Sequence, residues 1–134
     1  MKRTEALIPL SKDHHKALVT AKRINDLAEE AEVEIRNYWY AKREVLLREL
    51  TPHFETEEQT LLPLLKEISA DLSERLLSDH KLMLSMLRDE DNVQPIEFAE
   101  LLKTHVRFEE REMFPLLEEK YGDSELLSRL KGEL

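Results

Sequence analysis

Residues 53–67 read HFETEEQTLLPLLKE, and residues 105–119 read HVRFEEREMFPLLEE. The two stretches align without gaps and share the skeleton H-x3-E-E-x4-P-L-L-x-E. In each, a glutamate follows a histidine by four residues, which places both side chains on one face of an α-helix. A weaker echo precedes each copy, where Asp13-His14 matches Asp79-His80. The chain therefore reads as a helical hairpin present in two copies.

The composition around this repeat favours helices along the whole chain. Only two of the 134 residues are glycine, too few for the turns of an all-β or α/β domain, whereas Leu, Glu, Lys, Arg and Ala dominate. The length and the 41% of hydrophobic residues suit one domain with a single core. We therefore expect residues 1–134 to form one all-α domain.

Prolines and capping residues divide the chain into four long helices and a short one. Pro9 argues against an earlier start of the first helix, Asp71-Leu72-Ser73-Glu74 resembles a capping box, and Gly122 is a stop signal. The expected helices are residues 11–30, 32–63 with a kink or restart at Thr51-Pro52, 71–88, 95–121 and 124–130, with a loop at 89–94. Short connections imply antiparallel neighbours, so we expect an up-down-up-down four-helix bundle with a short C-terminal helix on its outside.

The absence of cysteine and the charge balance exclude several classes of protein. Without thiolates there is no disulfide, zinc ribbon, iron–sulfur cluster or cysteine nucleophile. A net charge of −9, with basic residues interleaved among acids, argues against nucleic acid as a partner. No uncharged stretch approaches the ~18 residues that span a bilayer, and the apolar run 7–10 is too short for a signal peptide. We expect a soluble, cytoplasmic protein with no membrane contact.

Four of the five histidines fall on the stripes that the four long helices should turn inward. Each repeat adds a glutamate to the same stripe, one turn after its histidine. The six residues are His14, His53, His80, His105, Glu57 and Glu109. A single histidine on an apolar face is usually satisfied by a neighbour, but four on four stripes are hard to obtain from independent packing choices. Buried carboxylates without compensation would cost several kcal/mol each, and two divalent cations would supply that compensation.

The mixture of imidazole and carboxylate donors suits iron, manganese or zinc, and six donors with two bridging carboxylates suit a di-metal centre. Iron is the leading candidate, with manganese and zinc as alternatives. No H-E-x-x-H motif of a zinc protease and no E-x-x-H motif of a ferritin-like centre occurs in the sequence.

With these motifs the chain resembles the hemerythrin family, specifically the bacterial HHE cation-binding domains. The resemblance runs from Ser11 to Tyr121 and is carried by Asp13-His14, His53-Phe54-x-x-Glu57-Glu58, Asp79-His80 and His105-x3-Glu109. It implies two iron ions inside a four-helix bundle, joined by an oxygen atom as an Fe–O–Fe centre. It also implies terminal histidines at 14, 53, 80 and 105, and bridging carboxylates at 57 and 109.

The sequence departs from the oxygen-carrying hemerythrins in its third helix. Those proteins offer H-x3-H there, whereas Leu76 and Leu84 stand one turn before and after His80. With four histidines and two glutamates, the pattern looks more like the di-iron proteins of iron sensing and iron–sulfur cluster repair.

Several neighbouring residues have open roles. His15 could supply a fifth histidine ligand, although it lies about 100° around the helix from His14. Glu58 and Glu110 could bridge, but we expect them to be solvated or to accept hydrogen bonds from ligands. The aspartates at 13 and 79 could orient a histidine, although adjacent residues on one helix do not face each other.

Three functions follow from these residues. The first is a di-iron protein that binds or senses oxygen, nitric oxide or peroxide, or that handles iron. The second is a di-iron enzyme, such as a peroxidase or oxidase, or an iron donor in iron–sulfur cluster repair. The third is a metal-free interaction bundle. The sequence names no protein partner, and it is compatible with a monomer or a homodimer.

Overall fold

The computed structural model describes residues 3–89 and 94–131, and the predicted all-α class is confirmed. No strand occurs in this part of the chain. The elements in order are η1 (Glu5–Leu7), α1 (Ile8–Ala28), α2 (Glu32–Thr56), η2 (Glu57–Leu61), α3 (Leu62–Ile68), α4 (Ala70–Arg88), α5 (Pro95–Phe108), η3 (Glu109–Met113), α6 (Phe114–Lys120) and α7 (Asp123–Lys131). None of the described helices is both long enough and apolar enough to cross a membrane.

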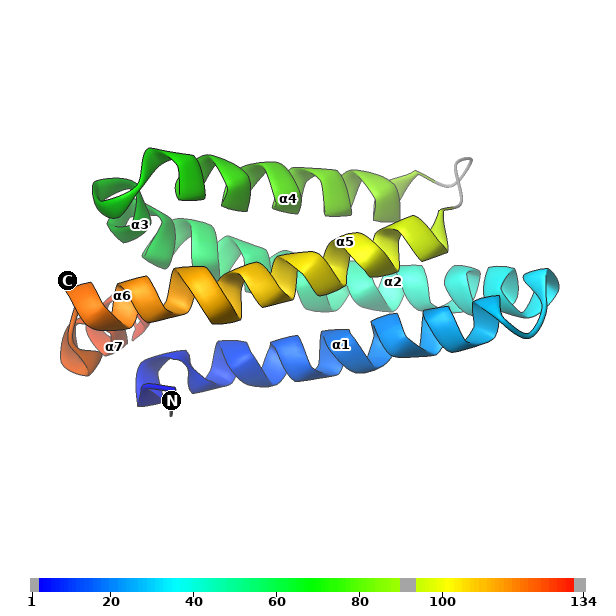
Figure 1. The fold of residues 1–134 in the computed structure, drawn as a ribbon, viewed down its shortest axis with the longest axis horizontal. Helices are drawn as coiled ribbons and strands as arrows, with labels where there is room; N and C mark the ends of the chain where they lie inside the picture. The colour runs from blue at the N-terminus through cyan, green and yellow to red at the C-terminus, as the bar shows by residue number, and fades with distance from the viewer. Residues whose placement is uncertain (1–2, 90–93, 132–134) are drawn as a thin grey trace.

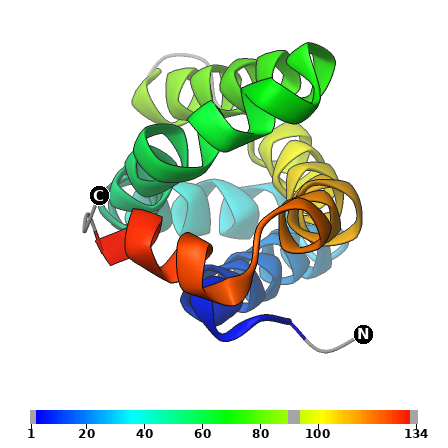
Figure 2. The ribbon, with the colours of Figure 1, turned by 90° about the vertical axis from the view of Figure 1, so that its left-hand side faces the viewer.

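The long helices pack in a closed ring of contacts. Helix α1 lies against α2 and α5, and α4 lies against the same two helices. Figure 1 shows these four helices side by side along the long axis of the molecule. At one end α7 crosses the ends of the long helices, as Figure 2 shows, and contacts η1 and η2. The interior enclosed by this ring is where the inward stripes meet.

Both copies of the repeat contain a π-helical turn, η2 and η3, at the same place. The N–H of Leu62 donates to the carbonyl of Glu57 five residues back, and the N–H of Phe114 donates to the carbonyl of Glu109. A proline follows each of these donors directly, at positions 63 and 115. Since proline has no N–H and crowds the carbonyl four residues before it, a widened turn relieves the clash without ending the helix.

This turn corrects the expected end of the second helix. Fading after Pro63 is wrong, because α3 carries the segment on to Ile68. Helix α2 also runs through Pro52 as one helix, so no restart occurs there. The widened turn accommodates Pro63, and at Pro52 packing of α2 on its neighbours holds the helix together.

Two other helix starts differ from expectation. Helix α1 begins at Ile8, with Pro9 in its first turn, where the missing N–H has no helical partner in any case. Helix α4 is capped by Ser69 rather than by a box at Asp71, since the Ser69 hydroxyl accepts the N–H of Leu72 at 3.2 Å. The expected loop at 89–94 lies mainly outside the described residues, which omit 90–93.

The buried apolar side chains form two clusters. The first, called here the apolar core, contains Trp39, Leu46, Leu87, Phe98 and Leu102 among others. The second, called the end cluster, contains Leu7, Leu61, Leu65, Phe114 and Leu126 among others. On α1, His14 lies between Leu10 of the end cluster and Ala17 of the apolar core, and on α4, His80 lies between Leu76 of the end cluster and Met83 of the core. Along the other two segments the core residue comes first, with the orders Leu50, His53, Leu61 and Leu102, His105, Met113. A polar layer therefore separates the two clusters.

Candidate metal centre

The polar layer is built from one histidine on each of α1, α2, α4 and α5 and from the first residue of each π-helical turn. These residues are His14, His53, His80, His105, Glu57 and Glu109, and none is more than 5% exposed. All six are the residues predicted as ligands from the sequence. The structure brings them together, although the residues of the two copies are up to 95 positions apart along the chain.

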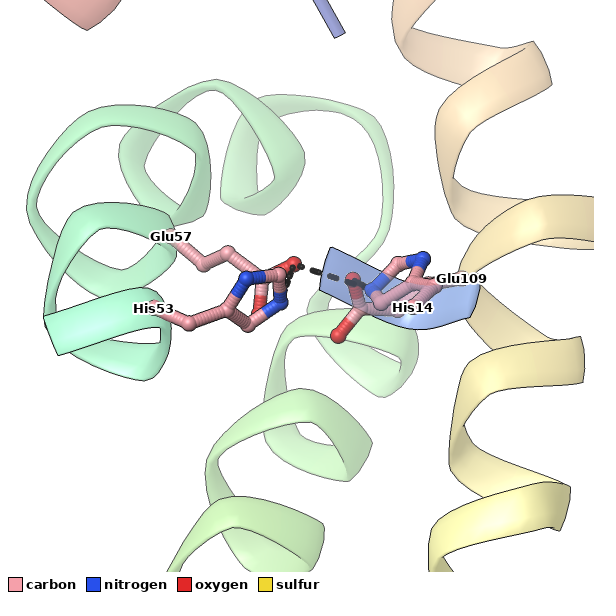
Figure 3. Close-up of side chains that lie close together, drawn as sticks. All are labelled: His14, His53, Glu57 and Glu109. Atoms are coloured by element: carbon pink, nitrogen blue, oxygen red, sulfur yellow. Dashed lines mark ion pairs between the residues drawn. The ribbon is translucent and has the colours of Figure 1, made fainter. Parts of the chain in front are cut away.

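The six side chains form two groups that share both glutamates. His14 and His53 with Glu57 and Glu109 make the first, and Figure 3 shows the four side chains pointing toward one another. The second combines His80 and His105 with the same two glutamates. Within each group the ligand atoms lie within 4.8 Å of one another, so each group could hold a metal ion. We call them the His14/His53 position and the His80/His105 position.

Each glutamate turns one oxygen toward each position. Glu57 directs Oε2 to His53 Nε2 at 3.4 Å and Oε1 to His80 Nε2 at 3.1 Å. Glu109 directs Oε1 to His14 Nε2 at 3.0 Å, and its Oε2 lies beside the Nε2 atoms of the second position. A carboxylate that presents its two oxygens to two adjacent groups has the arrangement of a bridging ligand. The spacing agrees with this use, because two donors about 2.1 Å from one ion are separated by about 3.0–3.4 Å.

An outer ring of carboxylates fixes the four imidazoles. The Nδ1 atom of each histidine lies 2.7–3.0 Å from a carboxylate oxygen on a different helical segment. The pairs are His14 with Glu110, His53 with Asp13, His80 with Glu58, and His105 with Asp79. Because these oxygens accept, Nδ1 carries a proton and Nε2 points into the centre, where a metal requires it without a proton. The duplication relates the His14–Glu110 pair to the His80–Glu58 pair, and the His53–Asp13 pair to the His105–Asp79 pair.

The sequence singled out these four acids, but it did not predict which histidine each of them contacts. Glu58 and Glu110 accept hydrogen bonds from two histidines, which was the expected alternative to bridging. Asp13 and Asp79 also orient histidines, but those on the following helix rather than their own sequence neighbours. Spacing along one helix contains no signal for this pairing, because it depends on the register between two helices.

His15 is the one predicted candidate that the structure leaves outside the centre. Its side chain is exposed, and it belongs to neither group of potential ligands. The π-helical turns are the feature that sequence reasoning missed. Their signal was present, since a proline follows the glutamate by six residues in both copies. Single π-helical turns inside α-helices occur frequently at functional sites.

The inward-facing polar atoms are buried without hydrogen bonds. Among the described residues, seven such atoms at the centre lack a partner: Nε2 of His14, His80 and His105, and both carboxylate oxygens of Glu57 and Glu109. An unsatisfied buried polar atom costs about 1–3 kcal/mol, and more if it is charged. Nitrogen and oxygen donors in this arrangement match the ligand preferences of iron, manganese and zinc. The residues thus fit a pair of divalent cations.

Burial and mutual repulsion set the protonation of the metal-free centre. Burial raises the pKa of Glu57 well above its ordinary value, and the charge of Glu109 adds to that rise. Burial lowers the pKa of His53. At His14 burial acts in the same direction, but the carboxylates of Glu109 and Glu110 outweigh it and raise the pKa to about 9. Without metal the centre therefore holds protons that an incoming cation must displace.

Comparison with known proteins gave no match to any protein-family model, curated protein or solved structure. The donor set and its geometry are therefore what supports a function for this chain.

Proposed function

We propose that this chain is a hemerythrin-like, non-haem di-iron protein, in which an up-down-up-down four-helix bundle encloses the two metal positions. The observation that carries the proposal is the pair of donor groups joined by Glu57 and Glu109, whose inward atoms lack hydrogen-bond partners. Each position offers two imidazole nitrogens and two carboxylate oxygens. This donor set favours iron, with manganese and zinc as alternatives.

Four protein donors for each metal leave coordination sites free for an external ligand. When bound, iron supplies the capacity to take up a small molecule such as oxygen, nitric oxide or peroxide. The aromatic rings beside the histidines favour a small ligand of low charge. Phe54 stacks on His80 with 3.9 Å between ring centroids, and Phe114 stacks on His14 at 5.4 Å. We therefore propose binding or sensing of such a ligand, or handling of iron, as the function.

In this proposal the residues of the chain have three tasks. The four histidines supply neutral nitrogen donors, and the outer carboxylates hold each ring in the tautomer that exposes Nε2 to the metal. Glu57 and Glu109 bring negative charge into the layer and thereby offset the charge of the two cations. The two apolar clusters on either side exclude water from the layer.

The test is iron analysis of protein expressed with iron and purified without oxygen, followed by an absorption spectrum of the same protein after oxidation in air. We expect two iron ions per chain and an absorption band of a bridged iron pair. Fewer than about one metal ion per chain, with no such band, would contradict the proposal. Steady-state consumption of peroxide or nitric oxide by the iron-loaded protein would instead assign a di-iron enzyme.

A paired substitution separates the proposal from a metal-free bundle. Replacing His53 and His105 together by leucine should release metal and lower the melting temperature, because metal binding contributes to folding energy. If the chain is only an interaction bundle, the same change removes buried polar groups and stabilises the fold. His15→Leu is the matched control, since this histidine is exposed.

A further inference from the structure

Arg3 contacts Glu110 and Phe114, the two residues that hold the ring of His14 from its outer side. Its side chain donates to the carbonyl of Glu110 at 3.0 Å, and its Nε lies 3.5 Å from the Glu110 carboxylate, which in turn accepts from His14 Nδ1 at 2.7 Å. Its guanidinium also lies over the ring of Phe114, 5.5 Å from the centroid, and that ring stacks on His14. A hydrogen bond of 2.6 Å to Glu118 holds Arg3 in place.

Arg75 stands in the same relation to His105 at the other metal position. Its guanidinium lies over Phe108, 4.2 Å from the centroid, and that ring packs against His105 at 6.0 Å. Its Nε is 3.8 Å from Oδ2 of Asp79, the same oxygen that accepts from His105 Nδ1 at 2.8 Å. A second carboxylate, that of Glu112, lies 3.5 Å from its Nη1.

This shared arrangement is not a product of the duplication. The offset that aligns His14 with His80 aligns Arg75 with Pro9, so Arg3 is not the copy of Arg75. Two unrelated segments thus place an arginine against the phenylalanine and the carboxylate that hold one ligand histidine. The two contacts also differ in strength. Arg3 forms two hydrogen bonds and is 20% exposed, whereas the polar contacts of Arg75 are longer ion pairs and its side chain is 40% exposed.

We propose that Arg3 and Arg75 are positioning residues, each acting on one metal position: Arg3 on the His14/His53 position and Arg75 on the His80/His105 position. The proposal rests on the proposed metal-binding function and adds that the two positions can be changed separately. The planar guanidinium suits this role, because it can stack on an aromatic ring and contact a carboxylate at its edge. The shorter polar contacts of Arg3 and its deeper burial predict the larger effect at its position.

Substitution by lysine separates positioning from charge. A cation close to a metal site repels the metal, so loss of charge alone would strengthen binding. Lysine keeps the charge but lacks the planar fork, and therefore a weaker metal affinity in Arg3→Lys or Arg75→Lys reports lost positioning. Removing a residue that holds a metal ligand typically costs 10–100-fold in affinity, and the arginines act one contact further out. We expect about a three- to tenfold loss for Arg3→Lys, and less for Arg75→Lys.

The experiment is a Zn²⁺ titration of the full chain, followed by NMR of ¹⁵N-labelled imidazoles. Zinc is diamagnetic, and the Nε2 signals of His14 and His53 report one position, while those of His80 and His105 report the other. Arg3→Lys should weaken only the His14/His53 position, and Arg75→Lys only the His80/His105 position. Arg36→Lys is the matched control, because Arg36 lies on the surface of α2, where it pairs with Glu32.

Three outcomes would overturn the proposal. Both variants could bind zinc as the wild type does, each could weaken both positions equally, or each could weaken only the opposite position. The free energy of unfolding of the zinc-free variants identifies a general loosening of the fold. If the wild type binds two zinc ions and the variants match it, only the positioning role fails. If the wild type binds none, the proposed function itself fails.

Discussion

The apolar core and the candidate metal centre lie in the same helical bundle and are both buried, but they differ in how many buried polar atoms lack a hydrogen-bond partner. Trp39, Leu46, Leu87 and Phe98 are at most 1% exposed and pack on one another. Among the described residues, the core leaves one buried side-chain atom without a partner, Nε1 of Trp39, whereas the neighbouring layer leaves seven. The inward stripe runs through both regions without interruption. Burial by itself thus says little about function, and so does a single unsatisfied donor, whereas seven unsatisfied nitrogen and oxygen atoms gathered in one layer indicate a binding site.

Removal of metal should have the largest effect on stability, and this effect should come from the candidate metal centre and not from the apolar core. A site loaded at about 1,000 times its dissociation constant stabilises the folded state by about 4 kcal/mol, so two sites contribute about 8 kcal/mol. Treatment of the loaded protein with a chelator should lower its melting temperature by well over 10 °C, on the order of 2–4 °C per kcal/mol for a chain of this size. Differential scanning calorimetry measures this, and an unchanged melting temperature would contradict a structural contribution of the metals.

A cavity in the apolar core should lower stability without changing the metal content. Phe98→Ala removes the ring that meets Trp39 edge to face, with 5.2 Å between centroids. We expect it to reduce the free energy of unfolding by about 3–5 kcal/mol, in both the loaded and the metal-free protein. Denaturant titration measures this loss of stability. Elemental analysis of the folded variant should give the wild-type metal content. Loss of metal together with stability would mean that the core and the centre do not act independently.

An outer carboxylate should affect affinity more than stability. Glu58→Ala removes the acceptor of His80 Nδ1, which lies 2.7 Å away, and frees the ring to rotate or change tautomer. We expect a 10–100-fold weaker zinc affinity at the His80/His105 position. Glu58→Gln should recover part of this loss, because its amide oxygen can accept the same hydrogen bond. Equal affinities for the alanine and glutamine variants would show that the charge, and not the hydrogen bond, is what matters.

Proton competition should make metal affinity depend on pH. In the metal-free protein the pKa of His14 is raised from 6.5 to about 9, and the pKa of Glu57 is also raised. Each proton displaced at neutral pH makes the apparent affinity rise about tenfold per pH unit. The raised histidine pKa stabilises the metal-free fold below pH 6.5, and this contribution is lost as the pH passes through about 9. Stabilisation by zinc should therefore grow between pH 6.5 and 9, and calorimetry at a series of pH values measures it. A stabilisation that does not change with pH would contradict proton competition.

Local chemistry explains which features could be predicted. Helix-forming composition, the four-residue spacing of His53 and Glu57, and the duplication are all properties of short segments, and they predict the helices and the six centre residues. The hydrogen bond from His53 to Asp13 joins two helices, and nothing in either segment sets their register. The continuation of helix beyond Pro63 depends on a π-helical turn that propensities do not describe. That the six residues bind iron stays a prediction.

Substitution of His15 should have the smallest effect, and it tests whether the centre contains four histidines or five. It is adjacent to His14 in sequence, but its side chain points to solvent and lies in neither donor group. His15→Ala should leave metal content unchanged and alter the free energy of unfolding by less than about 0.5 kcal/mol, as is usual for an exposed position. His14→Ala, one residue away, should lose the metal of the His14/His53 position, because it removes one of only two imidazoles there. If both alanine variants lost metal equally, His15 would be a ligand, and α1 would have to rotate or unwind locally to bring it inside.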